Sequence, residues 1–103
     1  MDEPLAYRAL VEELLRDPEV SETQMMGMPA LKLAGKLFGG RQGAELTLKI
    51  GRERAAELLA AGRARPFDPS GRGRPMKDWV LLGEPSADWS ELAGEALRFV
   101  RSA

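Results

Sequence analysis

The stretch that decides the fold is QMMGMPALKLAGKLFGGRQGAELTLKI, residues 24–50, in which apolar side chains recur at every second position. A period of two is typical of β-strands, because successive side chains of a strand point to opposite faces of the sheet. The clearest strand covers residues 44–50. We expect Leu46, Leu48 and Ile50 to face inward. The alternate residues Glu45, Thr47 and Lys49 are expected to face solvent.

Glycine divides this stretch into shorter strands. Three glycine-containing pairs predict turns, namely Ala34-Gly35, Gly39-Gly40 and Gln42-Gly43. The first of them is a tight hairpin turn between the apolar run that precedes it and the returning strand of residues 36–38. The pattern leaves the register of this hairpin open by one residue, so that Leu33 pairs either with Lys36 or with Leu37.

Helical periodicity lies on both sides of the β-rich stretch. The further elements that we expect are helices over residues 3–16 and 52–61, a strand over residues 76–82 and a last helix from Asp88. Asp2 is a candidate N-cap of the first helix, and Gly62 suits the C′ position of the second, whose inward residues are Ala55, Leu58 and Leu59. The order α-β-β-β-α-(β)-β-α predicts an α+β fold, an antiparallel sheet with helices packed against it.

The composition excludes most familiar catalytic sites. The 103 residues include no cysteine and no histidine, which excludes thiol nucleophiles, Cys-ligated metals and histidine acid–base chemistry. Zinc sites without these residues are rare, so we expect no metal, no cofactor and no enzymatic activity. No apolar run approaches the roughly 20 residues of a membrane span, and the acidic N-terminus lacks the basic region of a signal peptide. We therefore expect a cytoplasmic protein without membrane contact.

The segment GRARPFDPSGRGRPMKDW, residues 62–79, is too rich in Gly and Pro to form a helix. Its five basic side chains are the candidate anion-binding or partner-binding residues, Arg63, Arg65, Arg72, Arg74 and Lys77. Backbone N–H groups and guanidinium groups are the two devices by which proteins hold phosphates and carboxylates. The alternative is a structural loop that Pro66 and Phe67 anchor, with Asp68 paired to a nearby Arg and the other charges solvated.

Two further sets of side chains allow two interpretations each. The methionines Met25, Met26 and Met28 either fill the core or line an adaptable groove for a partner. Trp79 and Trp89 either belong to the core or offer faces on which nucleic-acid bases stack. Their places in the predicted strands and helix favour the core in both cases.

An ordered set of segments resembles the TfoX N-terminal domain family, with a more distant similarity in architecture to YjbR-like proteins. The matching segments are Met26-Gly-Met-Pro-Ala-Leu-Lys32, Gly35-Lys-Leu-Phe38, Leu46-Thr-Leu-Lys49, Gly71-Arg-Gly-Arg-Pro-Met-Lys77 and Trp79. The resemblance implies a two-layer fold with a curved antiparallel sheet of about five strands and flanking helices, in a single domain over residues 1–103. It also implies a link to a regulator of natural competence, which carries a second, helical domain.

These observations predict a non-catalytic regulatory or protein-interaction domain. Its ends are acidic and its middle is basic, a distribution that suits self-association, because a positive patch can meet a negative one. The alternative is a nucleic-acid-binding protein that uses the basic loop of residues 63–77, although the formal net charge of the chain is −1.

Overall fold

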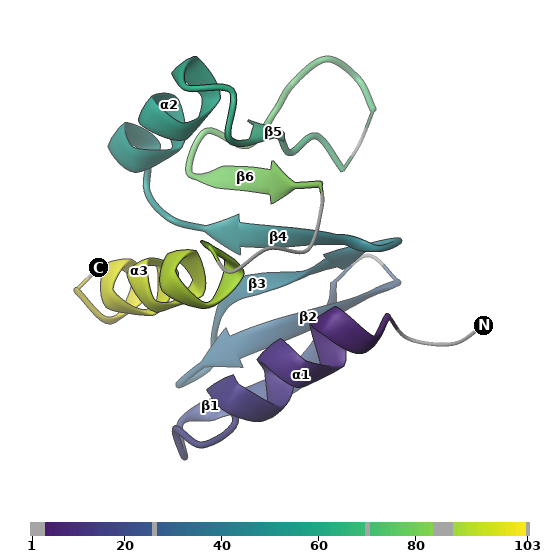
Figure 1. The fold of residues 1–103 in the computed structure, drawn as a ribbon, viewed down its shortest axis with the longest axis vertical. Coiled ribbons are helices and arrows are strands. Elements are labelled where there is room, and N and C mark those ends of the chain that lie inside the picture. The colour runs from purple at the N-terminus through teal and green to yellow at the C-terminus, as the bar shows by residue number, and fades with distance from the viewer. Residues whose placement is uncertain (1–3, 26, 70, 84–87, 103) are drawn as a thin grey trace.

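The computed structural model describes residues 4–25, 27–69, 71–83 and 88–102. The elements follow in the order α1 (Leu5–Leu14), β1 (Val20–Met25), β2 (Met28–Leu33), β3 (Lys36–Gln42), β4 (Glu45–Lys49), α2 (Arg52–Ala60), β5 (Arg65–Pro66), β6 (Trp79–Leu82) and α3 (Asp88–Ser102). Within these residues, six strands form one antiparallel sheet in the order β1-β2-β3-β4-β6-β5. Helices α1 and α3 cover one face, and α2 lies beside β5 and β6 (Figure 1). The predicted α+β class is confirmed.

The β2–β3 hairpin turns at Ala34-Gly35, as the sequence predicts. Both residues have positive φ, 50° and 86°, which is the backbone of a type I′ turn and matches the twist of the flanking strands. Leu33 pairs with Lys36, so the register left open by the sequence is resolved. Farther along, a bulge places Leu31 opposite Gly39 and Lys32 opposite Leu37, and the extra residue, Phe38, is fully buried.

The prediction of a turn at Gly39-Gly40 is wrong, because both residues lie inside β3. They are glycines because neighbouring strands approach closely: a Cβ on Gly40 would lie 2.5 Å from the carbonyl oxygen of Pro29. No separate strand was predicted over Val20–Met25, which forms the edge strand β1. The first helix is shorter than predicted, and its proposed cap, Asp2, lies outside the described residues.

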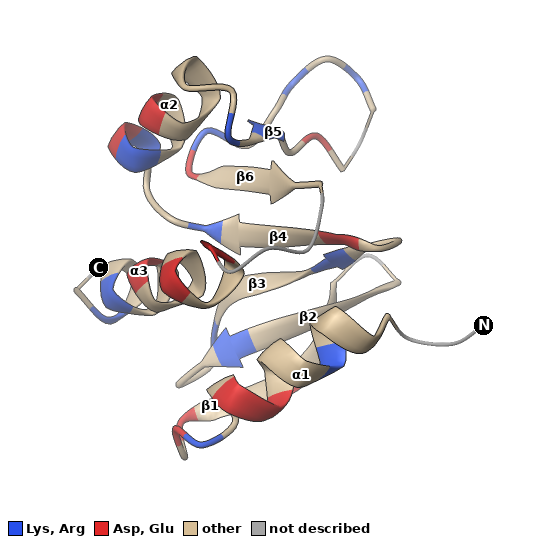
Figure 2. Cartoon of the chain, viewed as in Figure 1, with Lys and Arg blue, Asp and Glu red and all other residues tan. Residues whose placement is uncertain are grey.

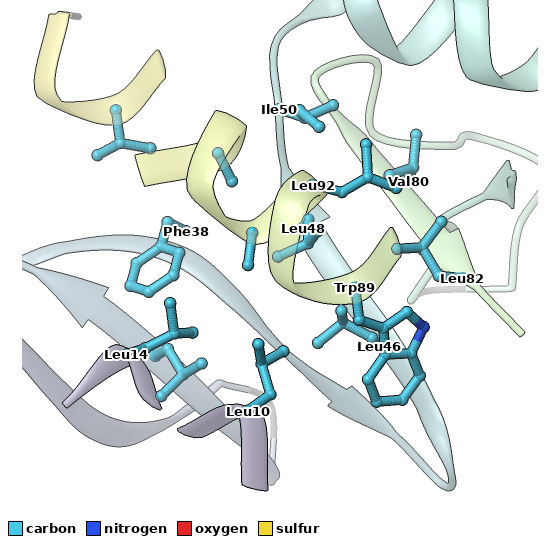
Figure 3. Close-up of a cluster of buried hydrophobic side chains, with 14 of the residues drawn as sticks. Leu10, Leu14, Phe38, Leu46, Leu48, Ile50, Val80, Leu82, Trp89 and Leu92 are labelled. Carbon is cyan, nitrogen blue, oxygen red and sulfur yellow. The ribbon is translucent and has the colours of Figure 1, made fainter. Parts of the chain in front are cut away.

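The main hydrophobic core lies between the sheet and the helices α1 and α3 (Figure 3). Its members come from every helix and from five strands, and they include Leu10 and Leu14 of α1, Phe38 of β3, Leu46 and Leu48 of β4, Val80 and Leu82 of β6, and Trp89 and Leu92 of α3. Ile50, just after β4, is also buried, which confirms the predicted inward set of this strand. Trp89 is likewise a core residue, as the favoured interpretation predicted.

A second cluster covers the opposite face of the sheet near β6. Trp79 and Leu81 alternate along β6 with residues of the main core, so they point to the other face, where Phe67 joins them. The Phe67 and Trp79 rings lie 5.5 Å apart between centroids. Thr47 pairs with Leu81 on this face and is only 1% exposed. The prediction that Thr47 faces solvent is therefore wrong, because a second layer of side chains covers it.

The end of α1 is tied to α3 through Asp17. The backbone N–H of Glu19 donates to its carboxylate at 3.0 Å, and Arg101 donates to the other oxygen at 2.6 Å. These two contacts, the backbone hydrogen bond first, hold the pKa of Asp17 below its ordinary value.

Candidate functional site

The loop that carries the candidate binding residues begins at a regular helix end. Gly62 has a φ of 71° and donates its N–H to the carbonyl of Leu59 at 3.1 Å, while the N–H of Arg63 reaches the carbonyl of Leu58 at 2.9 Å. This pair of bonds is a Schellman motif, which requires a residue in the left-handed region at C′. The prediction of Gly62 at that position is confirmed, and the motif fixes the direction in which the loop leaves α2.

The loop folds around its own carboxylate, that of Asp68. Gly71 donates its N–H to Oδ1 at 3.1 Å, and Gly73 and Arg74 donate theirs to Oδ2 at 2.8 Å and 3.2 Å. The two glycines have φ values of 68° and 75°, which turn successive N–H groups toward one point. The donors that the sequence suggested for an external anion therefore hold an internal one.

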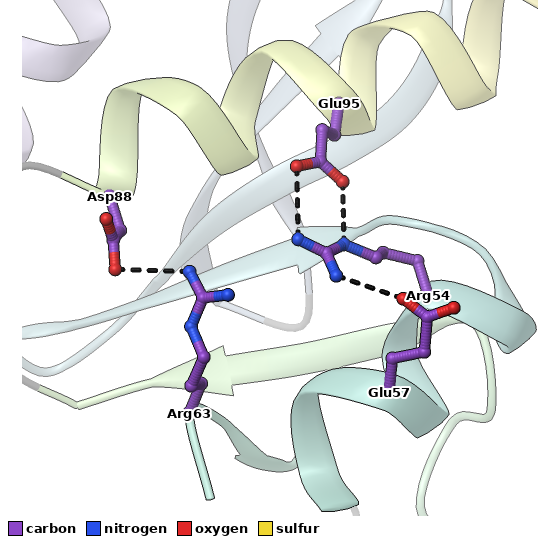
Figure 4. A network of polar contacts seen from close by, with 5 residues as sticks. All are labelled: Arg54, Glu57, Arg63, Asp88 and Glu95. Carbon is purple, nitrogen blue, oxygen red and sulfur yellow. Dashed lines mark hydrogen bonds and ion pairs between the residues drawn. The ribbon is translucent and has the colours of Figure 1, made fainter. Parts of the chain in front are cut away.

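The five predicted basic residues divide into two groups. Arg63 forms an ion pair with Asp88 of α3 at 3.2 Å (Figure 4), and Arg65 forms one with Glu45 of β4. The other three side chains, Arg72, Arg74 and Lys77, are exposed. The first group thus joins the loop to the fold, whereas the side chains of the second group lie on the surface of the protein.

A second ionic contact fixes α2 against α3. Arg54 donates to the two carboxylate oxygens of Glu95 at 2.8 Å and 3.3 Å, and to Glu57 at 3.0 Å (Figure 4). The hydrogen bonds to Glu95 and, to a smaller extent, to Glu57 raise the pKa of the Arg54 guanidinium above its ordinary value. A bidentate Arg–carboxylate pair constrains geometry more than a single contact does, so it helps to set the position of α2.

A cleft of about 330 Å³ lies between α2 and the returning arm of the loop, and we call it the α2–loop cleft. Its lining residues come from α2, β5, the loop and β6, namely Arg52, Ala56, Leu59, Pro66, Pro75, Met76, Lys77 and Trp79. The α2 residues are spaced i, i+4 and i+7 and so share one face of the helix. Trp79 is 5% exposed and is the most buried of these lining residues.

Backbone hydrogen bonds hold both walls of the cleft. The N–H of Met76 donates to the carbonyl of Phe67 at 2.9 Å, and the carbonyl of Asp78 accepts the N–H groups of Ile50 at 2.8 Å and Gly51 at 3.1 Å. The second contact joins the loop arm to the chain just ahead of α2. The cleft is therefore formed in the free protein, which lowers the entropic cost of binding.

Sequence reasoning missed most of this cleft. Lys77 was among the predicted binding residues, but Arg52 and Ala56 were not. Leu59 was predicted to face inward, whereas it lies in the cleft wall with 37% of its surface exposed. The only sequence signal is that Leu58 and Leu59, as neighbours on a helix, point about 100° apart, so the outer of the two lies at the border of the buried face.

No protein-family model, curated protein or solved structure matches this chain. Among the described residues, no helix has both the length and the apolar character that crossing a membrane requires.

Proposed function

We propose that the chain is a non-catalytic regulatory or protein-interaction domain, the role that its resemblance to the TfoX N-terminal domain family implies. We place its binding surface at the α2–loop cleft. The observation that carries the proposal is a preformed, mostly apolar hollow of about 330 Å³ with cationic side chains in its lining. Ligand-binding sites are typically concave and apolar with a few polar groups that fix orientation.

The exposure of Leu59 supports a partner at this place. Leu59 is 37% exposed, which makes it one of the exposed large apolar side chains of the described chain, and it lies in the wall of the α2–loop cleft. An exposed apolar side chain that borders further apolar surface is typical of interaction sites, whereas single ones elsewhere on a surface are common. Contact with a bound partner would therefore explain why an apolar side chain is exposed at position 59.

The non-catalytic part of the proposal follows from the side chains available. The sequence has no His or Cys, and the ionisable groups in the described lining of the cleft are one arginine and one lysine, Arg52 and Lys77, with no carboxylate among them. General acid–base catalysis works best with a group whose pKa is near the working pH. Binding is the chemistry that such a lining supports.

Nucleic-acid binding through residues 63–77 is the second candidate, and the exposure of Arg72 and Arg74 favours it. It predicts an affinity for short duplex DNA that falls steeply with salt. The Arg72→Ala, Arg74→Ala double variant would then flatten the plot of log affinity against log salt by about two units. An affinity that does not change with salt would contradict this candidate.

Site-specific photo-crosslinking in the organism that encodes the chain tests the proposed surface. A benzophenone amino acid replaces Ala56, which lines the cleft, or Ala60, which is exposed on the same helix outside the lining. We expect a discrete protein adduct from position 56, little from position 60, and loss of the adduct when Leu59→Asp is added. A product of twice the chain mass of 11.3 kDa would identify self-association. Equal adducts from both positions, or none from position 56, would contradict the proposed surface.

A further inference from the structure

A second hollow, of about 410 Å³, adjoins the α2–loop cleft. It shares Met76 and Trp79 with the cleft and extends from them toward β3 and the C-terminal part of α3. Its remaining lining residues are Met25, Gly35, Lys36, Leu37, Lys49, Phe99 and Val100. Because the same two side chains border both hollows, the hollows lie next to each other, and we call the two together the Met76 groove.

The Met76 groove has an apolar lining and one sign of charge. Its cationic residues are Arg52 and Lys77 in the cleft and Lys36 and Lys49 in the second hollow, and no Asp or Glu is among the described lining residues. The chain as a whole has 16 acidic and 15 basic residues, so a random patch of this size would carry both signs. Figure 2 shows the lysine and arginine positions in blue, among them those at the end of β4 and at the start of α2.

Three of these cations are available for an external partner. In the described parts of the chain, the side chains of Arg52, Lys49 and Lys77 form no hydrogen bond and no ion pair with another residue. By contrast, Arg54 and Arg63, on and just after the same helix, are both in ion pairs. The positive charge of these three side chains is therefore not neutralised by another described residue.

We infer that the Met76 groove binds an acidic peptide segment of a partner protein. At least two apolar side chains of that segment enter the two hollows, and its carboxylates meet Arg52, Lys77 and Lys49. The inference rests on the proposed function and names its class of partner. Methionine side chains such as Met25 and Met76 adapt to apolar anchors of different shape, and complementary charge gives specificity and a faster association rate.

The geometry favours a peptide over a single-stranded nucleic acid. Base recognition of that kind uses aromatic side chains that offer a ring face for stacking. Of the two aromatic residues in the described lining, Trp79 is 5% exposed and already packs on Phe67, and Phe99 is half-buried with its ring against Gly51. Apolar peptide side chains need no such face, since they fill volume beside methionine, leucine and proline.

Fluorescence anisotropy with a defined probe tests the inference. The probe is a short fluorescein-labelled peptide in which Phe and Leu are separated by pairs of Glu. Matched peptides carry Gln for every Glu, or Ala for Phe and Leu, and labelled oligothymidylate represents nucleic acid. We expect the acidic apolar probe to bind at least about tenfold more tightly than the others, because it alone meets both the cations and the hollows.

Charge-reversal substitutions in each of the two hollows show whether the bound peptide occupies both of them. We expect Lys77→Glu in the cleft and Lys49→Glu in the second hollow each to weaken binding of the probe by about 3- to 10-fold, the size typical of exposed charge pairs. Arg16→Glu makes the same charge change at an exposed residue that lines neither hollow, and should leave the affinity unchanged. Circular dichroism and thermal unfolding verify that each variant is folded.

The outcomes separate this inference from the proposed function. Equal affinity for the Gln peptide, or tighter binding of oligothymidylate, would overturn the inference. If Lys77→Glu weakens binding and Lys49→Glu does not, the ligand occupies the cleft alone, and the inference is wrong while the proposed function stands. If position 56 gives its crosslinked adduct but the probe peptide does not bind, the inference is again wrong while the proposed function stands. Failure of both the probe and the crosslink would reject both proposals.

Discussion

Replacement of Gly40 by alanine tests the closest backbone approach in the sheet. Gly40 lies inside β3, paired with Ala30 on one side and Thr47 on the other. An added Cβ would lie 2.5 Å from the carbonyl oxygen of Pro29 and 3.0 Å from the Cα of Ala30. Both are backbone atoms of β2, which is itself held by β1 and β3, so the contact can be relieved only if the strand moves.

The expected cost follows from two opposing effects. Forcing an extra methyl group into a packed site costs about 1–3 kcal/mol, and the backbone contact here places Gly40→Ala at the upper end. Removing a glycine from a strand returns roughly 0.5–1 kcal/mol, since the unfolded chain loses freedom. The net loss is about 2 kcal/mol, which for a domain of this size lowers Tm by roughly 10 °C. Urea unfolding followed by tryptophan fluorescence should show a midpoint about 1 M lower.

Gly43→Ala is the matched control. Gly43 has a φ of 63°, but a Cβ there would meet no atom within 4 Å, so its cost is that of the left-handed backbone alone, about 1 kcal/mol. The two tryptophans that report unfolding, Trp79 and Trp89, are 5% and 4% exposed, and neither substitution touches them. A Gly40→Ala midpoint equal to or above that of Gly43→Ala would refute the reasoning, because the steric contact would then be absent.

Three further predictions concern the core, the loop and acid stability. Leu48→Ala should lower the free energy of unfolding by about 2–5 kcal/mol, since Leu48 is fully buried, and a loss below about 1 kcal/mol would mean that the inward face of β4 is misassigned. Asp68→Ala should speed hydrogen exchange of the loop amides that its carboxylate accepts, and unchanged exchange would contradict the loop geometry. The N–H of Glu19 and then Arg101 lower the pKa of Asp17, so its ionised form stabilises the fold above the unfolded pKa, and this contribution is lost as pH falls through the folded pKa. Arg101→Gln should raise that pKa in an NMR titration, and an unchanged value would exclude the contact with Arg101.

The sequence predicts well the features that neighbouring residues determine. The inward residues Leu46 and Leu48 of β4, the turn at Ala34-Gly35 and the helix end at Gly62 all appear in the structure as predicted. Each depends on a local requirement, either the period of a strand or a backbone with positive φ that glycine meets at low cost. A few consecutive residues are enough to show such a local requirement.

Features set by distant neighbours were not predicted. Gly39-Gly40 has the composition of a turn, and only the nearness of Pro29 across the sheet explains why glycine stands inside a strand there. Thr47 has a polar side chain on an alternating strand, and only the second cluster around Trp79 explains its burial. In both cases the deciding contact is with a residue at least ten positions away in the chain, which periodicity does not detect.

The loop of residues 63–77 shows why a site is harder to predict than a strand. Glycines with positive φ and converging N–H groups suit an external phosphate and an internal carboxylate equally well, since both are anions. The presence of Asp68 in the same segment was the signal for the internal carboxylate. In the structure, this carboxylate accepts hydrogen bonds from three loop N–H groups. With those donors occupied, the loop acts as a rigid wall, and its returning arm brings Met76 and Lys77 to α2. In the proposed site, the charge of Lys77 therefore acts beside an apolar helix face, because the loop N–H groups that could hold a phosphate are occupied by Asp68.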